Sequence, residues 1–166
     1  ETLGIPVMLC AGNHDIPNYT DYPHLGVLKY IRDKHTATYS WGSPHNSSCY
    51  FYIHKGVKFI CLGTHPNKNN VKWLKKHLTD PGQPTIIYYH YSTDPADPYA
   101  SWWSDKEKDN FFASIDGYNV KAIINGHWHT SVCKTYKNIK NIICGSQMVL
   151  VRVDPNTGDI DANVCI

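Results

Sequence analysis

Residues 120–129, VKAIINGHWH, join a short apolar run to two histidines that follow a glycine. Val120 to Asn125 has the length and the β-branched content of a buried strand. His127 and His129 stand two positions apart, and on an extended backbone this spacing places both imidazoles on the same side. We therefore expect both histidines to face one site at the end of this strand.

A histidine follows a predicted strand at two earlier places in the chain. The apolar run Ile5–Ala11 ends in residues 12–15, GNHD, and the run Pro84–Tyr89 ends at His90. Ligands of α/β sheets bind just outside the carboxyl ends of the strands. The three strand ends are therefore expected to bring their histidines together in one crevice.

The other apolar patterns predict a mixed α/β fold with layers of strands and helices. Helical spacing and capping signals predict three helices, at Tyr22–Lys34, at Val71–Leu78 and after the capping box of Ser104 and Glu107. The segment Ser92–Trp103 has three prolines and no periodicity, which predicts a long loop. The remaining runs predict a strand pair, Cys49–His54 with Val57–Leu62, and a terminal β meander of Asn141–Gly145, Met148–Val153 and Asp159–Val164.

Composition narrows the class of protein. The 166 residues carry a net charge of only +2, so we expect no nucleic-acid partner. No run approaches the roughly 18 apolar residues of a membrane span, so none is expected. Hydrophobic residues make up 42% of the chain, which favours a folded domain over a disordered one.

The cysteines and two sequons bear on the compartment. Cys10, Cys61 and Cys144 lie in apolar runs and are expected to be buried free thiols, whereas Cys49, Cys133 and Cys165 could form bridges. Glycosylation sequons begin at Asn18 and Asn46, about as many as chance would give. We favour a secreted or lumenal location on these signals.

The ordered motifs Gly-Asn-His-Asp, a strand-end His90 and Gly-His-x-His resemble those of the calcineurin-like metallophosphoesterases. The resemblance runs from Ile5 to about Val153, and residues 89–91 with 102–105 also resemble a secreted branch of that family. It implies a layered β-sandwich flanked by helices, and hydrolysis of phosphomonoesters or phosphodiesters at a dinuclear centre. The expected cofactors are two divalent or trivalent ions, zinc, manganese or iron, and the expected partner is a small phosphorylated substrate.

The resemblance also assigns roles by position. It makes Asn13, His90 and His127 ligands of one metal and His129 a ligand of the other. His14 becomes the general acid that protonates the departing oxygen, and Asp15 becomes the partner that fixes the tautomer of His14. Two metal ions would clamp the phosphoryl oxygens between them.

The family's upstream Asp-x-His and Gly-Asp motifs are absent from this sequence. We therefore expect residues 1–166 to be the C-terminal portion of a single phosphoesterase domain without its N-terminal strands, and its partners to include that missing segment. The four expected ligands are neutral, so they would offset little of the charge of two cations. Little activity is expected from these residues alone with added Mn²⁺ or Zn²⁺.

Rival interpretations remain open at this point. The chain could be a catalytically deficient phosphoesterase fold that acts as a binding module, or a disulfide-linked secreted β module with incidental histidines. The aromatic residues Tyr91, Tyr99, Trp102, Trp103 and Trp128 could form a wall for a sugar, a nucleoside or a lipid headgroup. Trp102 and Trp103 could equally clamp their loop to the helix that carries Phe111 and Phe112.

Overall fold

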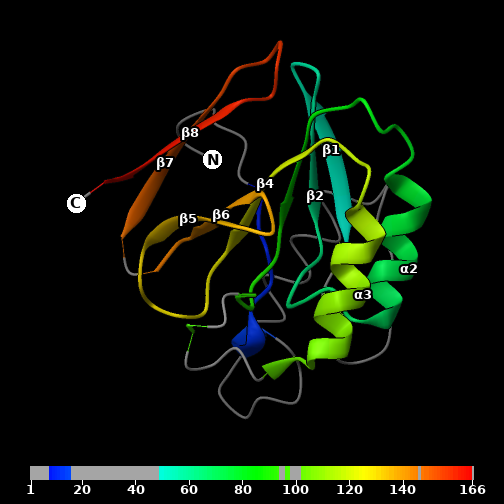
Figure 1. Cartoon of the computed structure of the whole chain (residues 1–166). Helices are drawn as coiled ribbons and strands as arrows, with labels where there is room; N and C mark the ends of the chain where they lie inside the picture. Colours follow the sequence, from blue (N-terminus) through cyan, green and yellow to red (C-terminus); the bar gives the residue numbers. More distant parts are fainter. Residues whose placement is uncertain (1–7, 16–48, 94–95, 98–101, 146, 166) are drawn as a thin grey trace.

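The structure is a computed structural model that describes residues 8–15, 49–93, 96–97, 102–145 and 147–165, without the side chains of 162–165. A six-stranded sheet in the order β1-β2-β3-β4-β6-β5 forms its centre, and β7 and β8 form a separate two-stranded sheet (Figure 1). The elements, in chain order, are a 3-10 turn η1 (Asn13–Asp15), β1 (Tyr50–His54), β2 (Val57–Cys61), α2 (Lys68–His77), β3 (Thr85–Tyr88), α3 (Asp105–Ile115), β4 (Val120–Asn125), β5 (Val132–Tyr136), β6 (Ile139–Ile143), β7 (Met148–Val153) and β8 (Ile160–Cys165).

The centre of the main sheet is parallel. β2 pairs with β3, β3 with β4 and β4 with β6, all in the parallel sense, while β1 and β5 pair antiparallel at the two edges. α2 connects β2 to β3 and α3 connects β3 to β4, as parallel neighbours require. The carboxyl ends of β3 and β4 therefore lie side by side, and this confirms the predicted α/β class.

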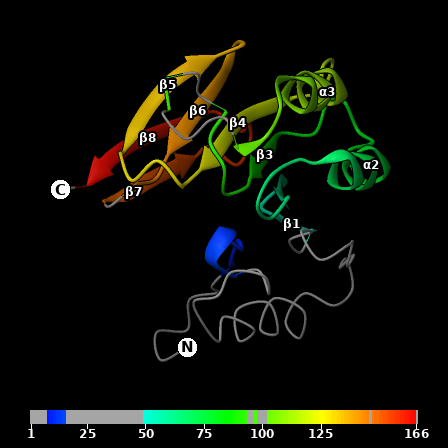
Figure 2. The same cartoon turned by 90° about the horizontal axis from the view of Figure 1, so that it is seen from below.

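The two helices lie together on one face of the main sheet, and η1 and the β7–β8 hairpin lie on the other side (Figure 2). Alternating residues of the strands divide between these faces. Ile60 and Ile87 join the core under the helices, whereas Cys61 and Tyr88 face the segment that precedes η1. The sheet is thus covered on both faces, which is typical of parallel sheets.

Several local predictions are confirmed. The turn between β1 and β2 has positive φ at Lys55 and Gly56, 47° and 79°, as a two-residue hairpin of type I′ needs. Ser104 and Glu107 form the predicted capping box of α3. No helix within the described parts of the chain is long and apolar enough to cross a membrane.

The predicted strand Ile5–Ala11 is not confirmed. Its described residues, 8–11, form no strand. The segment is held by contacts with side chains and with the loop after β2. The Tyr50 hydroxyl donates to the Leu9 carbonyl over 2.6 Å, and the Cys10 thiol donates to the Gly63 carbonyl over 3.2 Å. The predicted helix Tyr22–Lys34 lies outside the described residues.

The predicted terminal meander is wrong in its first strand. β6, which covers most of Asn141–Gly145, joins the main sheet beside β4, and only β7 and β8 pair with each other. β5 was not predicted from the sequence; it forms a hairpin with β6 through Lys137 and Asn138, both at positive φ. Two of the five residues of β5, Lys134 and Thr135, are polar, so its apolar pattern was too weak to predict a strand.

The expected bridges are also wrong where they can be checked. Cys49 and Cys133 form no disulfide in the described structure, and neither do Cys10, Cys61 and Cys144. The side chain of Cys165 lies outside the described residues. Cys49 is buried in the core under the helices, an apolar environment in which cysteine often packs as a small hydrophobic residue.

Candidate active site

Three polar side chains from distant parts of the chain meet at the carboxyl ends of β3 and β4. His90 follows β3, His127 follows β4, and Asn13 begins the turn η1. The His90 Nε2 atom lies 2.7 Å from the Asn13 Oδ1 atom and 3.1 Å from the His127 Nδ1 atom. The predicted convergence of three segments is therefore present for these residues.

The backbone of His90 is held on both sides. Its amide donates to the Gly63 carbonyl, just after β2, and its carbonyl accepts from the Gly126 amide, just after β4, at 2.8 and 2.9 Å. These bonds continue the parallel ladder beyond β3. The position of His90 is therefore set by the sheet itself and not by a free loop.

Two glycines make room for the His90 imidazole. A Cβ added at Gly12 would lie 3.1 Å from its Cε1 atom, and one added at Gly126 would lie 3.3 Å from its Nδ1 atom. Both distances are shorter than ordinary contacts of a Cβ. The ring thus sits between two stretches of backbone that approach closely because they lack side chains.

The electrostatics of the cluster favour neutral imidazoles. Burial, followed by the effects of the neighbouring His127, His14 and His129, lowers the pKa of His90 to about 4. Burial also lowers the pKa of His127, against the opposing effect of Asp97. Neutral imidazoles present lone pairs, which is the state in which histidine binds a metal ion.

The backbone at the two histidines of the Gly-His-x-His motif differs from the predicted one. His127 and His129 have φ of 68° and 52°, and the Trp128 amide donates to the Gly126 carbonyl, so this segment turns instead of extending. The predicted reason for placing both imidazoles on one side is therefore wrong. His127 meets His90, whereas His129 is exposed.

η1 presents His14 to solvent. His14 is exposed, while Asn13 beside it is only 4% exposed. The Asp15 carboxylate accepts from the Gly12 amide over 2.7 Å, and the Asp15 amide donates to the Gly12 carbonyl over 3.1 Å. Asp15 thus closes the turn that carries His14, and its predicted contact with the His14 imidazole stays a prediction.

The site matches a family of known proteins. A model of the calcineurin-like phosphoesterase family matches residues 1–131. The chain belongs to the calcineurin-like phosphoesterase family. Hydrolysis of phosphoesters with the help of metal ions is the general activity of calcineurin-like phosphoesterases. No curated protein matches the chain.

The donor atoms that meet at the site are of a kind that binds metal ions. The amide oxygen of Asn13 and the ring nitrogens of His90 and His127 are neutral donors that suit zinc and similar ions, and Gly12 and Gly126 leave room for the ring between them. In the described parts of the chain, no three His, Cys, Asp or Glu side chains are grouped so that they could hold a metal. The expected roles of Asn13, His90, His127 and His129 as ligands of two metals therefore stay predictions.

A buried carboxylate near the cluster, Asp97, does not stand out in the sequence. Asp97 is only 3% exposed, and its charge raises the pKa of His127. Sequence alone could not separate it from Asp105, which is exposed and pairs with Lys108 on α3 over 3.2 Å. The difference lies in burial, which the proline-rich loop pattern does not reveal.

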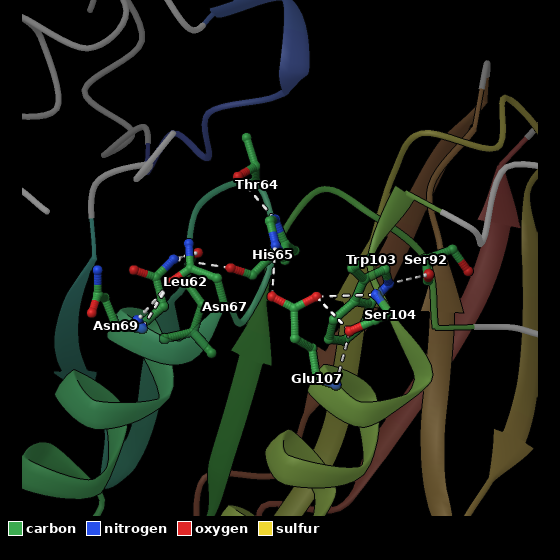
Figure 3. A network of polar contacts seen from close by, with 10 residues as sticks. Leu62, Thr64, His65, Asn67, Asn69, Ser92, Trp103, Ser104 and Glu107 are labelled. Atoms are coloured by element: carbon green, nitrogen blue, oxygen red, sulfur yellow. Dashed lines mark hydrogen bonds and ion pairs between the residues drawn. The ribbon is translucent and has the colours of Figure 1, made fainter. Parts of the chain in front are cut away.

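A network of polar contacts fixes the loops around the site (Figure 3). His65 Nε2 lies 3.9 Å from the Glu107 carboxylate, which also accepts from the Ser104 amide. The Trp103 indole donates to the Ser92 carbonyl over 3.1 Å. These contacts connect the loop after β2 and the loop after β3 to the start of α3. The two loops beside the site are therefore fixed in place by the helix.

Proposed function

We propose that the chain acts in the hydrolysis of phosphomonoesters or phosphodiesters at a dinuclear metal centre, to which it contributes Asn13, His90, His127 and His129. Membership of the family supports the reaction class. The observation that carries the proposal is the meeting of Asn13 Oδ1, His90 Nε2 and His127 Nδ1 at distances of 2.7 and 3.1 Å. Zinc, manganese or iron would supply Lewis-acid stabilisation of the phosphoryl oxygens when bound.

The residues of the chain divide the remaining work. The backbone of His90 is held by hydrogen bonds on both sides, so His90 fixes the position of the proposed metal centre. His14 stands exposed on η1, where it can approach the ester oxygen that leaves and give it a proton. Asp15 holds η1 closed and so keeps His14 in place.

A second candidate function is a binding module without catalysis. It is favoured by the neutral donor set, because in the described residues no carboxylate stands among the three side chains that meet. Such a module would bind a phosphorylated ligand without cleaving it. The two functions differ in turnover and not in binding, so one experiment can separate them.

The experiment uses the full-length protein with added Mn²⁺ or Zn²⁺. The release of p-nitrophenol from p-nitrophenyl phosphate and from bis(p-nitrophenyl) phosphate is measured for the unmodified protein, for His90→Ala and for His54→Ala. His54→Ala is the control, because His54 is an exposed strand residue. Hydrolysis that needs metal and is lost in His90→Ala but kept in His54→Ala supports the enzyme. Binding of phosphate without any turnover would favour the binding module.

A further inference from the structure

Trp102 is the large aromatic side chain that stands open to solvent beside the cluster of Asn13, His90 and His127. It is 47% exposed, whereas its neighbour Trp103 is only 2% exposed. Trp103 packs edge-on to Tyr89 and near Phe111, so the predicted clamp is formed by this one of the two tryptophans. Trp102 turns the other way and takes no part in that core.

Ring contacts connect Trp102 directly to the cluster. Its indole stacks on Tyr91 at 5.8 Å with 29° between the planes, and it meets the His127 ring edge-on at 5.8 Å. Tyr91 in turn lies 4.8 Å from the His127 ring. The three rings form one continuous aromatic surface that begins at a proposed metal ligand.

The support beneath Trp102 is rigid. Tyr91 is only 7% exposed, and its amide donates to the Thr64 carbonyl over 2.8 Å. His65 packs against both Tyr91 and Trp103, and its ion pair with Glu107 ties it to α3. Tyr91 therefore covers one side of the indole and fixes it, while nearly half of the side chain remains accessible.

An indole held in this way is a surface for another flat ring. Exposing so much apolar area costs free energy, and a stacked aromatic ligand would recover it. The surface lies beside His127, so a ring joined to a phosphoryl group through its ester oxygen would reach it without a long spacer. A small aliphatic leaving group would leave the indole exposed.

We propose that Trp102 selects phosphoesters whose leaving group is an aryl group, by stacking on its flat ring. The proposal rests on the proposed function, because the phosphoryl group must be held at the cluster of Asn13, His90 and His127. It adds the chemical class of the leaving group, which hydrolysis of phosphoesters in general does not specify. Tyr91 acts as the positioning residue that keeps the indole in place.

The test measures binding, so that it does not depend on turnover. Phenylphosphonate and methylphosphonate, two anions that cannot be hydrolysed at an ester bond, are titrated calorimetrically into the Mn²⁺-loaded protein. The variants are Trp102→Leu, which keeps apolar bulk, Trp102→Phe, which keeps a ring, and Leu150→Ala, which removes an exposed apolar side chain of β7.

We expect the wild-type protein to bind phenylphosphonate about three- to tenfold more tightly than methylphosphonate, the range expected of one aromatic pair. Trp102→Leu should bring the ratio of the two Kd values close to one, while Trp102→Phe and Leu150→Ala should keep most of it. A wild-type ratio near one, or an unchanged ratio in Trp102→Leu, would overturn the proposal. Failure of both phosphonates to bind would overturn the proposed function and this proposal with it.

Discussion

The Nε2 atom of His90 lies 2.7 Å from the Oδ1 atom of Asn13, although 77 positions separate the two residues in the chain. The two side chains approach each other from different elements. His90 follows the end of β3, and Asn13 belongs to η1, which lies on the side of the sheet opposite the two helices (Figure 2). The contact therefore reports that η1 is docked against the carboxyl edge of the main sheet. A metal ion bound between them would hold this docking in place.

Removal of either donor should weaken metal binding. We expect Asn13→Ala and His90→Ala each to lower the affinity for Zn²⁺ by at least about tenfold, because loss of even an outer partner of a ligand typically costs that much. Competition with a chromophoric chelator measures the affinity and the number of ions bound. His54→Ala is the control, since this exposed histidine of β1 is remote from the ends of β3 and β4. Equal affinity in all four proteins would contradict the assignment.

The glycines around His90 give a second, independent test of the same site. Gly126→Ala would place a Cβ 3.3 Å from the His90 Nδ1 atom, so the imidazole must shift by a few tenths of an ångström. We expect weaker Zn²⁺ binding, by about tenfold, as for other changes that disturb the orientation of a ligand. The control is Gly82→Ala, where the nearest atom is a flexible carboxylate oxygen of Asp80 at 3.4 Å.

Two measurements separate a local effect from unfolding in that experiment. Urea unfolding should show a change in stability of no more than about 2 kcal/mol for Gly126→Ala, within the usual range of point substitutions. Zn²⁺ affinity should fall in Gly126→Ala and not in Gly82→Ala. If Gly126→Ala bound Zn²⁺ as tightly as the unmodified protein, the close fit of the ring between the two glycines would be irrelevant to the metal.

Much of the scaffold could be predicted from sequence because its signals are local. The hairpin turn at Lys55 and Gly56, the capping box of Ser104 and the apolar stripe of α2 each depend on residues within a few positions of one another. The meeting of His90 and His127 was predicted from a general rule on strand ends, and the parallel pairing of β3 and β4 satisfies that rule. Asn13 was expected at the same place from the family resemblance, and it arrives there from a segment that forms no strand in its described residues.

The sequence-based predictions are wrong where a structure depends on residues far away in the chain. β6 pairs with β4 and not with β7, and a run of apolar residues does not encode which neighbour it joins. The positive φ of His127 and His129 depends on the turn around Gly126, which an assumption of extended backbone could not anticipate. Asp97 is only 3% exposed, and the proline-rich sequence around it does not encode that burial either.

The role of His14 can be tested through the leaving group. A general acid matters most when the departing oxygen is strongly basic, so His14→Ala should slow hydrolysis of phenyl phosphate by about 100-fold or more. Hydrolysis of p-nitrophenyl phosphate should fall much less, because its leaving group departs without help. The ratio of kcat values for the two esters in each protein is the measurement. An equal loss on both esters would instead point to a role of His14 in binding.

The capping box of α3 gives the fold a dependence on pH that is separate from the site. Burial alone would raise the pKa of Glu107, but its bonds with Ser104 and the charge of His65 outweigh burial and lower the pKa below its ordinary value of 4.5. A carboxyl group with a lowered pKa in the folded state stabilises the protein above its unfolded pKa. That contribution is lost as the pH falls through the lowered folded value.

We therefore expect Glu107→Gln to cost about 0.5 kcal/mol near neutral pH, a small value because the carboxylate is partly exposed and screened by solvent. Toward pH 3 the difference from the unmodified protein should shrink, because protonation of the carboxyl group increases as the pH falls toward and through its lowered folded pKa. Urea unfolding at the two pH values measures this change. Asp109→Asn serves as the control, since this exposed carboxylate of α3 pairs only with Lys137 in the described structure, at 3.4 Å. A cost of Glu107→Gln that is the same at both pH values would show that the side chain acts through packing and not through its charge.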